Sequence, residues 1–527
     1  MHSRPRILVI LLSLLLLILM CGTSYAIPAF SRQYGTSCST CHIDFPKLND
    51  FGKAFKDAGF KFPKDDESFI KIPPIMLGAP ANKELWPRTI WPGTIPGLPP
   101  IGLRFNTFFQ VVSKNRNNFN TGNLATPGTF IPRTDFQPGL FSIFMAGNFG
   151  SDIAFWVDSD LNVGGSNAAG GLGDGYLKFV NISRLFKLPT DSLSLRVGQF
   201  ELDLPFSQAR THNLSGWDIY DEANTGAMNS LFPQQNVNNA FAFSSATQGV
   251  EFSGGHTYRG YHYSLAIVNQ NTGGTPAGGT NVPPIVGFVS DSNFKDLYGR
   301  FSYRFNLERD PASRNEIQAA GATGPRDHTY LNLGTFYFYG KSVQRFSGFQ
   351  SDGITANVIT AREPFYRAGG DFSFNYRTFN LYGLYMVGHD MNLLPFTFPN
   401  LPPGGQGPNG FVRDHPATFN GGFVQADYLA LPWVMAIMRY DFVHSNADRI
   451  NGFGADVNNP PPSPFFSPFH STRNRITPGV QFLIHANIKA SFEYQVRPQQ
   501  AIFAPDGTLL TKPFRTNSAL AGLEFVY

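Results

Sequence analysis

The sequence has few cysteines, few charges and few long apolar runs. It contains 3 cysteines in 527 residues, and charged residues make up 15% of the chain, against about 25% in typical soluble proteins. The only long apolar run, Ile7–Met20, lies at the extreme N-terminus, so a bundle of membrane helices is not expected. The formal net charge is +4 at pH 7, which suggests no polyanion-binding surface, and nucleic acid is therefore not an expected partner.

Aromatic residues are abundant. They make up 15% of the chain, with 52 Phe and 20 Tyr, and they occur beside 53 Gly and 40 Pro. This aromatic content argues against disorder, and together with the low charge it is unlike that of an ordinary soluble enzyme. The sequence has no G-x-S-x-G elbow with triad partners, no phosphate loop in context and no zinc protease motif. Hydrolytic and phosphotransfer catalysis are therefore not expected, and no catalytic residue is predicted.

The first residues have the pattern of an export signal. Two arginines precede the apolar run, and Ser24-Tyr25-Ala26 then places small residues at both positions that a signal peptidase reads. We therefore predict a signal peptide over residues 1–26, cleaved after Ala26. A lipoprotein anchored at Cys21 is the alternative, although Met20 stands where a small residue would be expected.

The mature chain retains two cysteines, which belong to one motif. Cys38-Ser39-Thr40-Cys41-His42 is C-x-x-C-H, the attachment signature of a c-type haem. In that chemistry the two thiols add across the haem vinyl groups, and the adjacent His42 is the proximal ligand of the iron. A zinc site would need two further ligands at short spacing, and a thioredoxin-like site would need a βαβ context. A plain disulfide or a chance match is the remaining alternative to one covalently bound c-type haem.

A short helix is predicted after the motif. Leu48, Phe51 and Phe55 recur at three to four residues, which is one apolar stripe on a helix, and Gly59 suits its C-terminal cap. Residues 27–62 are too few to bury a core unaided. We therefore expect the stripe to lie against the porphyrin, with the haem as the core of a monohaem cytochrome c domain over residues 27–62.

The N-terminal residues also resemble a known family. The resemblance is carried by Ala26-Ile-Pro-Ala-Phe-Ser-Arg-Gln-Tyr-Gly35, Cys38-Ser-Thr-Cys-His42, Pro46, Leu48, Gly52, Phe55 and Gly59-Phe60. This segment is similar to the N-terminal signature of the fused monohaem c-type cytochrome-porins, the outer-membrane family that contains the neutrophilic and acidophilic iron oxidases. Ser31 stands where that family more commonly has Ala, and Phe60 where it more commonly has Tyr.

The resemblance implies a haem-bearing plug, a C-terminal β-barrel and electron transfer across the outer membrane of a Gram-negative-type bacterium. An extracellular donor such as Fe(II) would pass electrons to a periplasmic cytochrome, which would make the chain an iron(II):cytochrome c oxidoreductase. The signature marks the architecture more firmly than the substrate, so another donor, or outward flow to an acceptor such as Fe(III), stays open. A transport porin with a structural haem plug is the third hypothesis.

The rest of the chain has the pattern of a membrane barrel, independently of the resemblance. Segments of about ten residues alternate apolar with polar side chains, as strands between lipid and a polar lumen must. In Leu297–Phe305, for example, Phe301 and Tyr303 lie on one face, and Arg300 and Arg304 on the other. The chain ends in an alternating strand with a terminal aromatic residue, Tyr527, which resembles the assembly signal of outer-membrane barrels. A soluble β-sandwich or a solenoid would not explain apolar faces this aromatic together with so few charges.

About 16 strands are predicted, an even number as single-chain bacterial barrels require. They begin near residues 101, 140, 152, 174, 193, 247, 260, 297, 329, 366, 379, 421, 434, 475, 487 and 517. Tight and long connections alternate, which would put both termini at the periplasmic end. Residues 307–328 break this alternation, so a strand there could be miscounted. The predicted fold is thus mainly β, a transmembrane antiparallel barrel over residues 101–527 with a small α-helical haem plug.

The segment between plug and barrel, residues 63–100, is rich in proline. We predict an extended tether that does not join the barrel's hydrogen-bond ladder. Met76 is the only Met or His in it and is one candidate for the distal haem ligand, with a barrel-derived His or Met as the alternative. Arg32 and Tyr34 are candidates for contacts with the haem propionates.

Overall fold

The structure is a computed structural model, and it describes most of the chain outside the N-terminal leader and the long connections. The described residues are 29–44, 47–62, 66–87, 89, 93–98, 100–112, 116–117, 130–131, 134–150, 152–162, 171–207, 211, 213–221, 246–269, 294–307, 329–349, 356–390, 393–396, 410–413, 417–445, 472–485, 487–496, 502–503, 509–510 and 517–527. The predicted signal peptide, residues 1–26, and the alternative anchor at Cys21 lie outside these residues.

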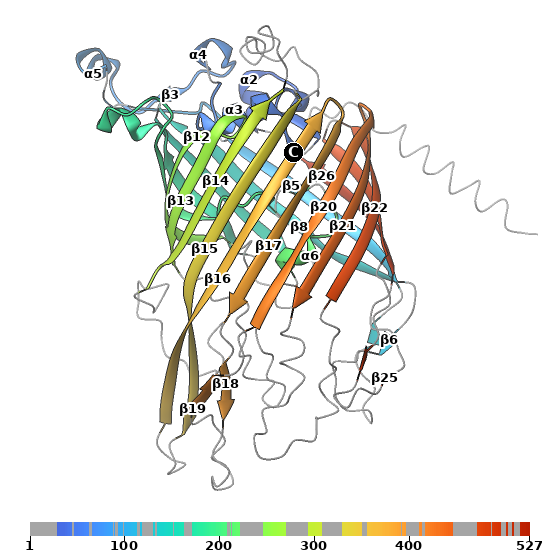
Figure 1. Ribbon diagram of the computed structural model, residues 1–527. Helices are drawn as coiled ribbons and strands as arrows, with labels where there is room; N and C mark the ends of the chain where they lie inside the picture. The colour runs from blue at the N-terminus through green and yellow to red at the C-terminus, as the bar shows by residue number, and fades with distance from the viewer. Residues whose placement is uncertain are drawn as a thin grey trace, which may run out of the picture.

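Sixteen antiparallel strands form one closed barrel (Figure 1). They are β5 (Ile101–Val112), β8 (Thr134–Phe149), β9 (Ile153–Asn162), β10 (Gly171–Phe179), β11 (Ser194–Phe200), β12 (Thr247–His256), β13 (Arg259–Val268), β14 (Asp296–Asn306), β15 (Tyr330–Phe349), β16 (Ala356–Tyr376), β17 (Phe379–Asp390), β20 (Ala417–Leu431), β21 (Val434–Ser445), β22 (Thr472–His485), β23 (Ile488–Gln495) and β26 (Ser518–Val526). The last strand, β26, pairs with the first, β5, so no edge is left open.

Each strand of the prediction corresponds to one strand of the barrel, which confirms the count of 16. Two strands begin earlier than predicted: β8 at Thr134 and β16 at Ala356. Pro138 and Pro364 lie inside these extensions. A proline usually indicates a loop, because it cannot donate a backbone hydrogen bond to a neighbouring strand. Pro138 lies where the β5–β8 register shifts, a place where a strand tolerates proline.

The alternation of side chains is confirmed as well. In β14, Leu297 and Phe301 point outward and are 47% and 49% exposed. Arg300 and Arg304 point into the lumen and are 8% and 3% exposed. On this strand the outer face is apolar and the inner face is charged, as expected for a strand between lipid and a polar lumen.

The connections confirm the predicted alternation, with two exceptions. The pairs β8–β9, β16–β17, β20–β21 and β22–β23 are joined by the predicted tight turns. The β10–β11 and β14–β15 connections lie at the same end and are long. Strands β14 and β15, on either side of residues 307–328, pair directly with each other, so the predicted count is unaffected. The N-terminal segment and the C-terminus both lie at this short-turn end (Figure 1).

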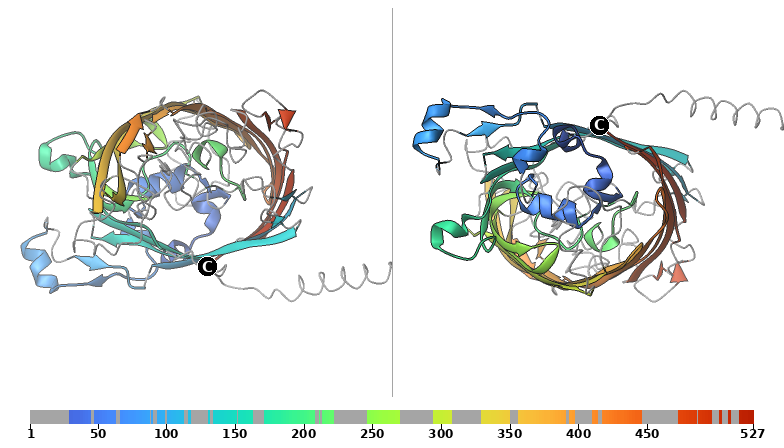
Figure 2. Two further views of the ribbon diagram at one scale, coloured as in Figure 1. Left: turned by 90° about the horizontal axis from the view of Figure 1, so that it is seen from below. Right: turned by 90° about the horizontal axis from the view of Figure 1, so that it is seen from above.

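The N-terminal residues fold as a plug that lies inside the ring of strands at the short-turn end (Figure 2). The plug consists of α2 (Ala29–Tyr34), η1 (Cys38–Thr40), β1 (His42–Asp44), β2 (Lys47–Leu48) and α3 (Asp50–Asp57). Helix α3 ends as predicted, since Gly59 has a φ of +77° just beyond it. Among the helices in the described part of the chain, none combines the length and apolar character needed to cross a membrane.

The predicted tether does not join the barrel sheet, but it is not simply extended. It contains α4 (Asp66–Phe69), α5 (Pro80–Leu85), and a small sheet of β3 (Ile75–Met76) and β4 (Thr94–Ile95). Proline caused the error: Pro80 occupies the first turn of α5, where its missing N–H costs nothing. Helices α4 and α5 and strand β3 lie beside the barrel rim (Figure 1).

Short elements decorate the connections. They are η2 (Ile182–Phe186) and the two-stranded pairs β6 (Arg116–Asn117) with β7 (Phe130–Ile131), β18 (Leu393–Phe396) with β19 (Gly410–Arg413), and β24 (Ile502–Phe503) with β25 (Leu509–Leu510).

A second segment besides the plug enters the lumen. Residues 201–207, 211 and 213–221, which we term the crossing segment, follow β11 and end in α6 (Asp218–Asp221), within the barrel (Figure 1). Leu202, Trp217 and Ile219 are buried against inward side chains of the wall. The wall residues of this cluster are Tyr176, Phe200, Ala266, Val268, Tyr298, Phe336, Phe338, Phe365, Tyr382, Leu384, Met386, Phe419, Phe423 and Val443. The largest apolar core of the protein thus lies inside the barrel.

Candidate functional site

The two cysteines of the predicted haem motif are free thiols in the plug. Cys38 lies in η1 and Cys41 directly after it, and both are half-buried. Burial raises the pKa of the Cys41 thiol to about 12, so the group is neutral at ordinary pH. The two sulfurs are not joined in a disulfide. Two unbridged thiols followed by His42 are the donor set that covalent attachment of a c-type haem requires, so these residues fit the group.

Asn49 fastens the motif to helix α3. As the N-cap of α3, its side-chain oxygen accepts a hydrogen bond from the Gly52 N–H at 2.8 Å. Its side-chain amide donates to the Thr40 carbonyl at 3.0 Å, and its backbone N–H donates to the Cys41 carbonyl at 3.0 Å. One asparagine therefore fixes both the start of the helix and the loop that carries the thiols. This role of Asn49 was not predicted from the sequence, although Asn before a helix is a known capping signal.

Gly52 allows the helix to approach the motif closely. A Cβ atom built on Gly52 would lie 2.2 Å from the Cys41 carbonyl oxygen and 3.0 Å from Leu48 Cδ2. The Cys41 carbonyl is backbone and cannot yield as a flexible side chain would. Any side chain at Gly52 would therefore push α3 away from the Cys41-His42 loop.

The plug has an aromatic core of its own. Phe51 and Phe55 pack against Phe62 with ring centroids at 5.0 and 6.0 Å, and Phe55 also meets Tyr34 at 5.8 Å. The predicted helical stripe is thus only partly correct, because Leu48 lies in β2, before the helix begins. The two phenylalanines contact protein rings, an arrangement possible because aromatic residues outside the stripe, such as Tyr34 and Phe62, supply the partners.

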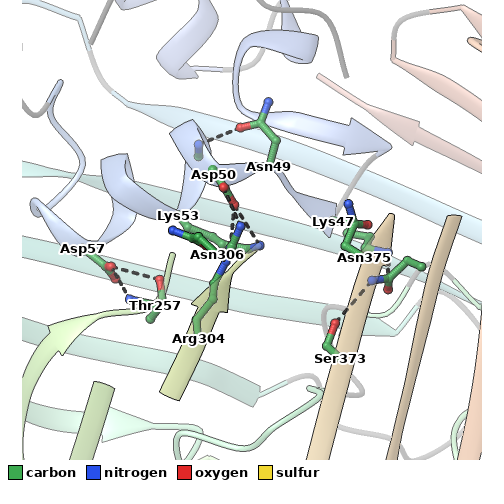
Figure 3. A network of polar contacts seen from close by, with 12 residues as sticks. Lys47, Asn49, Asp50, Lys53, Asp57, Thr257, Arg304, Asn306, Ser373 and Asn375 are labelled. Atoms are coloured by element: carbon green, nitrogen blue, oxygen red, sulfur yellow. Dashed lines mark hydrogen bonds and ion pairs between the residues drawn. The ribbon is translucent and has the colours of Figure 1, made fainter. Parts of the chain in front are cut away.

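Ionic contacts fix the plug to the barrel wall (Figure 3). Both carboxylate oxygens of Asp50, in α3, accept hydrogen bonds from the Arg304 guanidinium of β14, at 2.7 and 2.6 Å. Both side chains are buried, and such a bidentate pair is strong and directional. On another side of the plug, Lys47 Nζ lies 3.4 Å from Asp427 of β20.

Other contacts complete the seat of the plug. Asp57 Oδ2 accepts hydrogen bonds from the backbone N–H and the hydroxyl of Thr257, both at 2.9 Å. The Phe60 ring lies 5.7 Å from Trp156 of the inner wall. A Cβ built on Gly59 would lie 2.7 Å from Val180 Cγ2, so this glycine serves the close approach of plug and wall as well as the helix end.

The accessory residues predicted for the haem are engaged elsewhere. The Tyr34 hydroxyl donates to Asp66 at 2.7 Å, and the Arg32 guanidinium donates to the Ile101 carbonyl at 2.7 Å. Met76 lies in β3, on the sheet beside the barrel rim, and its side chain is 40% exposed. These positions do not favour Tyr34 and Arg32 as propionate partners or Met76 as the distal ligand.

A cavity of about 410 Å³ separates the plug from the crossing segment, and we term it the plug chamber. Its walls combine plug residues such as Leu48 and Lys53, inward residues of the barrel such as Lys178, and residues of the crossing segment such as Trp217. Leu48 and His42 are Cα partners in the β1–β2 pair, so their side chains project from one face of that pair. The chamber therefore reaches the β1–β2 pair at Leu48, the strand partner of His42.

The crossing segment is held on two opposite stretches of the barrel wall. On one stretch, the Tyr298 hydroxyl of β14 donates to the Asp203 carbonyl at 2.6 Å, and His262 of β13 lies 3.1 Å from the Asp203 carboxylate. The other stretch is formed by β20 to β23, which hold residues 213–216. The described residues of the segment therefore contact both sides of the lumen.

Charged side chains make the second attachment. Glu493 of β23 accepts hydrogen bonds from the Leu214 N–H at 2.6 Å and from the Ser215 hydroxyl at 2.6 Å. Arg439 donates to the Ser215 carbonyl at 2.9 Å, and Arg475 to the Gly216 carbonyl at 2.5 Å. The sequence predicted only a long external loop over 201–246, and the buried charges of the wall strands gave no indication of their partners.

Comparison with known proteins does not assign a family. The sequence matches no protein-family model, and no curated protein is detectably similar to it. Similar solved structures include OprB of Pseudomonas putida at high pH, with 10% identity and a TM-score of 0.43 over 81% of this chain and 94% of that one. OmpT of Vibrio cholerae, expressed in the outer membrane, has 9% identity and a TM-score of 0.41 over 86% and 100% of the two chains. OmpF of Salmonella typhi in complex with daunomycin has 8% identity and a TM-score of 0.42 over 81% and 97%.

Proposed function

We propose that this chain is an outer-membrane electron-transfer protein in which one c-type haem is held by a plug inside a porin-type barrel. The observation that carries the proposal is the position of the C-x-x-C-H motif: two free, half-buried thiols and His42 lie in a plug that is fixed inside the lumen. The apolar outer face of the closed barrel supports an outer-membrane location.

The residues of the plug would divide the work of holding the group. Cys38 and Cys41 would form the thioether bonds, and His42 would be the proximal ligand of the iron. Asn49 and Gly52 keep the Cys41-His42 loop against α3, which fixes the direction of the imidazole. A bound haem would supply a one-electron redox centre, and the surrounding protein would tune its potential by burial and ligation.

The topology supports a direction for the current. In bacterial barrels short turns face the periplasm and long loops face outward, and here the plug lies at the short-turn end. A periplasmic cytochrome would thus meet the plug directly. A reductant outside the cell, with Fe(II) as the leading candidate substrate, would approach from the long-loop end, on the other side of the crossing segment.

Reduction of purified holoprotein by Fe(II) tests this donor. We expect the haem absorbance to change to that of the reduced form on mixing with Fe(II) in a stopped-flow instrument. A haem that Fe(II) does not reduce would remove iron oxidation from the proposal. A haem potential well below that of the Fe(III)/Fe(II) couple would favour another donor, or outward flow to an extracellular acceptor.

A transport porin with a structural plug is the second candidate, and the fold taken alone supports this porin-type role. A closed barrel of 16 strands encloses a lumen wide enough for a channel, and its inner face carries charged side chains beside the apolar cluster. The plug and the crossing segment both occupy that lumen, which favours electrons over solutes. Solute flux into liposomes that contain the holoprotein, without reduction of an enclosed electron acceptor, would support the transport porin.

A further inference from the structure

The plug chamber is lined by many charged side chains, and most of its cations have an acidic partner. Arg196 of β11 lies 2.5 Å from Glu251, and Arg300 of β14 lies 3.0 Å from Asp371. Arg304 holds Asp50 at the edge of the plug. These pairs offset the cost of placing charge in a lumen that is partly shielded from bulk water.

Lys178 is the exception among the lining residues that the structure describes. It lies on β10, points into the chamber, and has Ala154 and Arg196 as its two cross-strand neighbours. Within the described part of the chain, its ammonium makes neither a hydrogen bond nor an ion pair. Its nearest inward neighbour on β11 is thus a second cation, an arrangement that is unfavourable for a directly opposed pair.

The acids that face Lys178 are already engaged. The charges around it are Asp57 of α3, Glu251 of β12, Asp203 of the crossing segment, and Arg196. Asp57 accepts two hydrogen bonds from Thr257, Glu251 holds Arg196, and Asp203 holds His262. A further anion in the chamber would give the ammonium the partner that the protein itself does not supply.

We infer that the plug chamber is an anion site in which Lys178 binds a carboxylate. The cavity, at about 410 Å³, lies within the range of about 300–1,000 Å³ that is usual for small-ligand pockets. The carboxylate has two possible sources of the same chemistry. One is a haem propionate, a source that rests on the proposed function and agrees with the nearness of the motif, since Leu48, the strand partner of His42, lines the chamber. The other is a free small carboxylate that enters from solution.

Substitution of Lys178 in purified holoprotein tests the haem source. With a propionate as partner, Lys178→Met removes the charge that keeps this carboxyl ionised, and the carboxyl's proton affinity rises about tenfold. The pH range over which the haem potential changes then lies about one pH unit higher than in the wild type. Lys178→Arg keeps the charge and should restore the wild-type profile, whereas Lys187→Met, which alters a lysine after η2, should leave it unchanged.

Titration calorimetry with citrate at low ionic strength tests the free source on the same preparations. With a free carboxylate as partner, wild-type protein binds citrate, and Lys178→Met weakens this affinity tenfold or more, while Lys178→Arg and Lys187→Met do not. If neither the pH profile of the potential nor citrate affinity responds to Lys178→Met, the inference is overturned and Lys178 is simply hydrated. Haem staining of the same protein separates this from failure of the proposed function, because a chain without haem still leaves citrate binding to decide.

Discussion

The plug and the crossing segment both fill the lumen, yet they are held in different ways and differ in how easily a sequence discloses them. The plug is fixed by ion pairs and hydrogen bonds around α3, such as Asp50 with Arg304, and by a small apolar cluster that joins Phe60 to Trp156 of the wall. The crossing segment buries Trp217 and Ile219 in the largest apolar core and adds charged contacts from β21 to β23. The difference suggests distinct roles: the plug carries the residues predicted to bind haem, and the crossing segment obstructs the lumen.

The largest effect is expected from a substitution in the C-x-x-C-H motif of the plug. We expect Cys41→Ser to abolish double thioether attachment, with loss of most covalent haem, because one of the two bonds cannot form. The barrel should still assemble, since none of its strands depends on this thiol. Haem staining after denaturing electrophoresis measures the loss, and Ser39→Ala is the matched control. Undiminished staining in Cys41→Ser would contradict the predicted role of the plug in covalent haem attachment.

The next effect concerns the crossing segment. Trp217 is buried and stacks on Phe423 with ring centroids at 4.7 Å, and truncation of such a residue costs about 3–5 kcal/mol. We expect Trp217→Ala to loosen the segment and raise ion conductance in planar bilayers, without altering haem staining. Trp86→Ala, which alters an exposed tryptophan after α5, should conduct like the wild type. Equal conductance of Trp217→Ala and wild type would argue that this segment does not obstruct the lumen.

A smaller effect is expected where the plug meets the wall. Arg304→Ala leaves buried Asp50 with Lys53 as its remaining cation, at 3.4 Å, and removal of one partner from a buried pair costs about 3–5 kcal/mol. The remaining Lys53 places the expected value at the lower end. Limited proteolysis should cleave the plug faster in Arg304→Ala than in the wild type or Arg184→Ala. Unchanged cleavage would mean that aromatic contacts such as Phe60 with Trp156 suffice.

The smallest effect is internal to the plug. Asn49→Ala removes a helix cap, at a cost of about 0.5–2 kcal/mol, together with the bond to the Thr40 carbonyl. Asn49→Asp retains the capping oxygen and loses only that donor, so it should be cleaved at an intermediate rate in the same proteolysis assay. If Asn49→Asp behaved as Asn49→Ala does, the bond to the motif loop would be the dominant contribution.

The sequence was sufficient for the barrel because a strand between lipid and a polar lumen leaves a simple period-two pattern. Residues 297–305 display it, and the strand count followed from such segments. The pattern failed where proline entered a strand, as at Pro138 and Pro364, because proline is then indistinguishable from a loop signal.

The sequence was insufficient for the contacts between elements. The C-x-x-C-H motif is local and could be recognised, but the pairing of Asp50 with Arg304 joins residues 254 positions apart. Residues 201–221 lack alternation, so they were read as a loop outside the barrel, and only the folded wall supplies Glu493, Arg439 and Arg475 as their partners. Met76 was singled out for its position along the chain, which did not disclose its exposure on β3.

The most direct test of the account is the reduction of an acceptor enclosed in liposomes that carry the protein, after Fe(II) is added outside. The account predicts that the enclosed acceptor is reduced with wild-type holoprotein and is reduced far more slowly with Cys41→Ser, which provides the same barrel with most of the covalent haem lost. Reduction at equal rates with both proteins would mean that Fe(II) itself passes through the lumen. No reduction with haem-loaded wild type would contradict the proposed electron transfer.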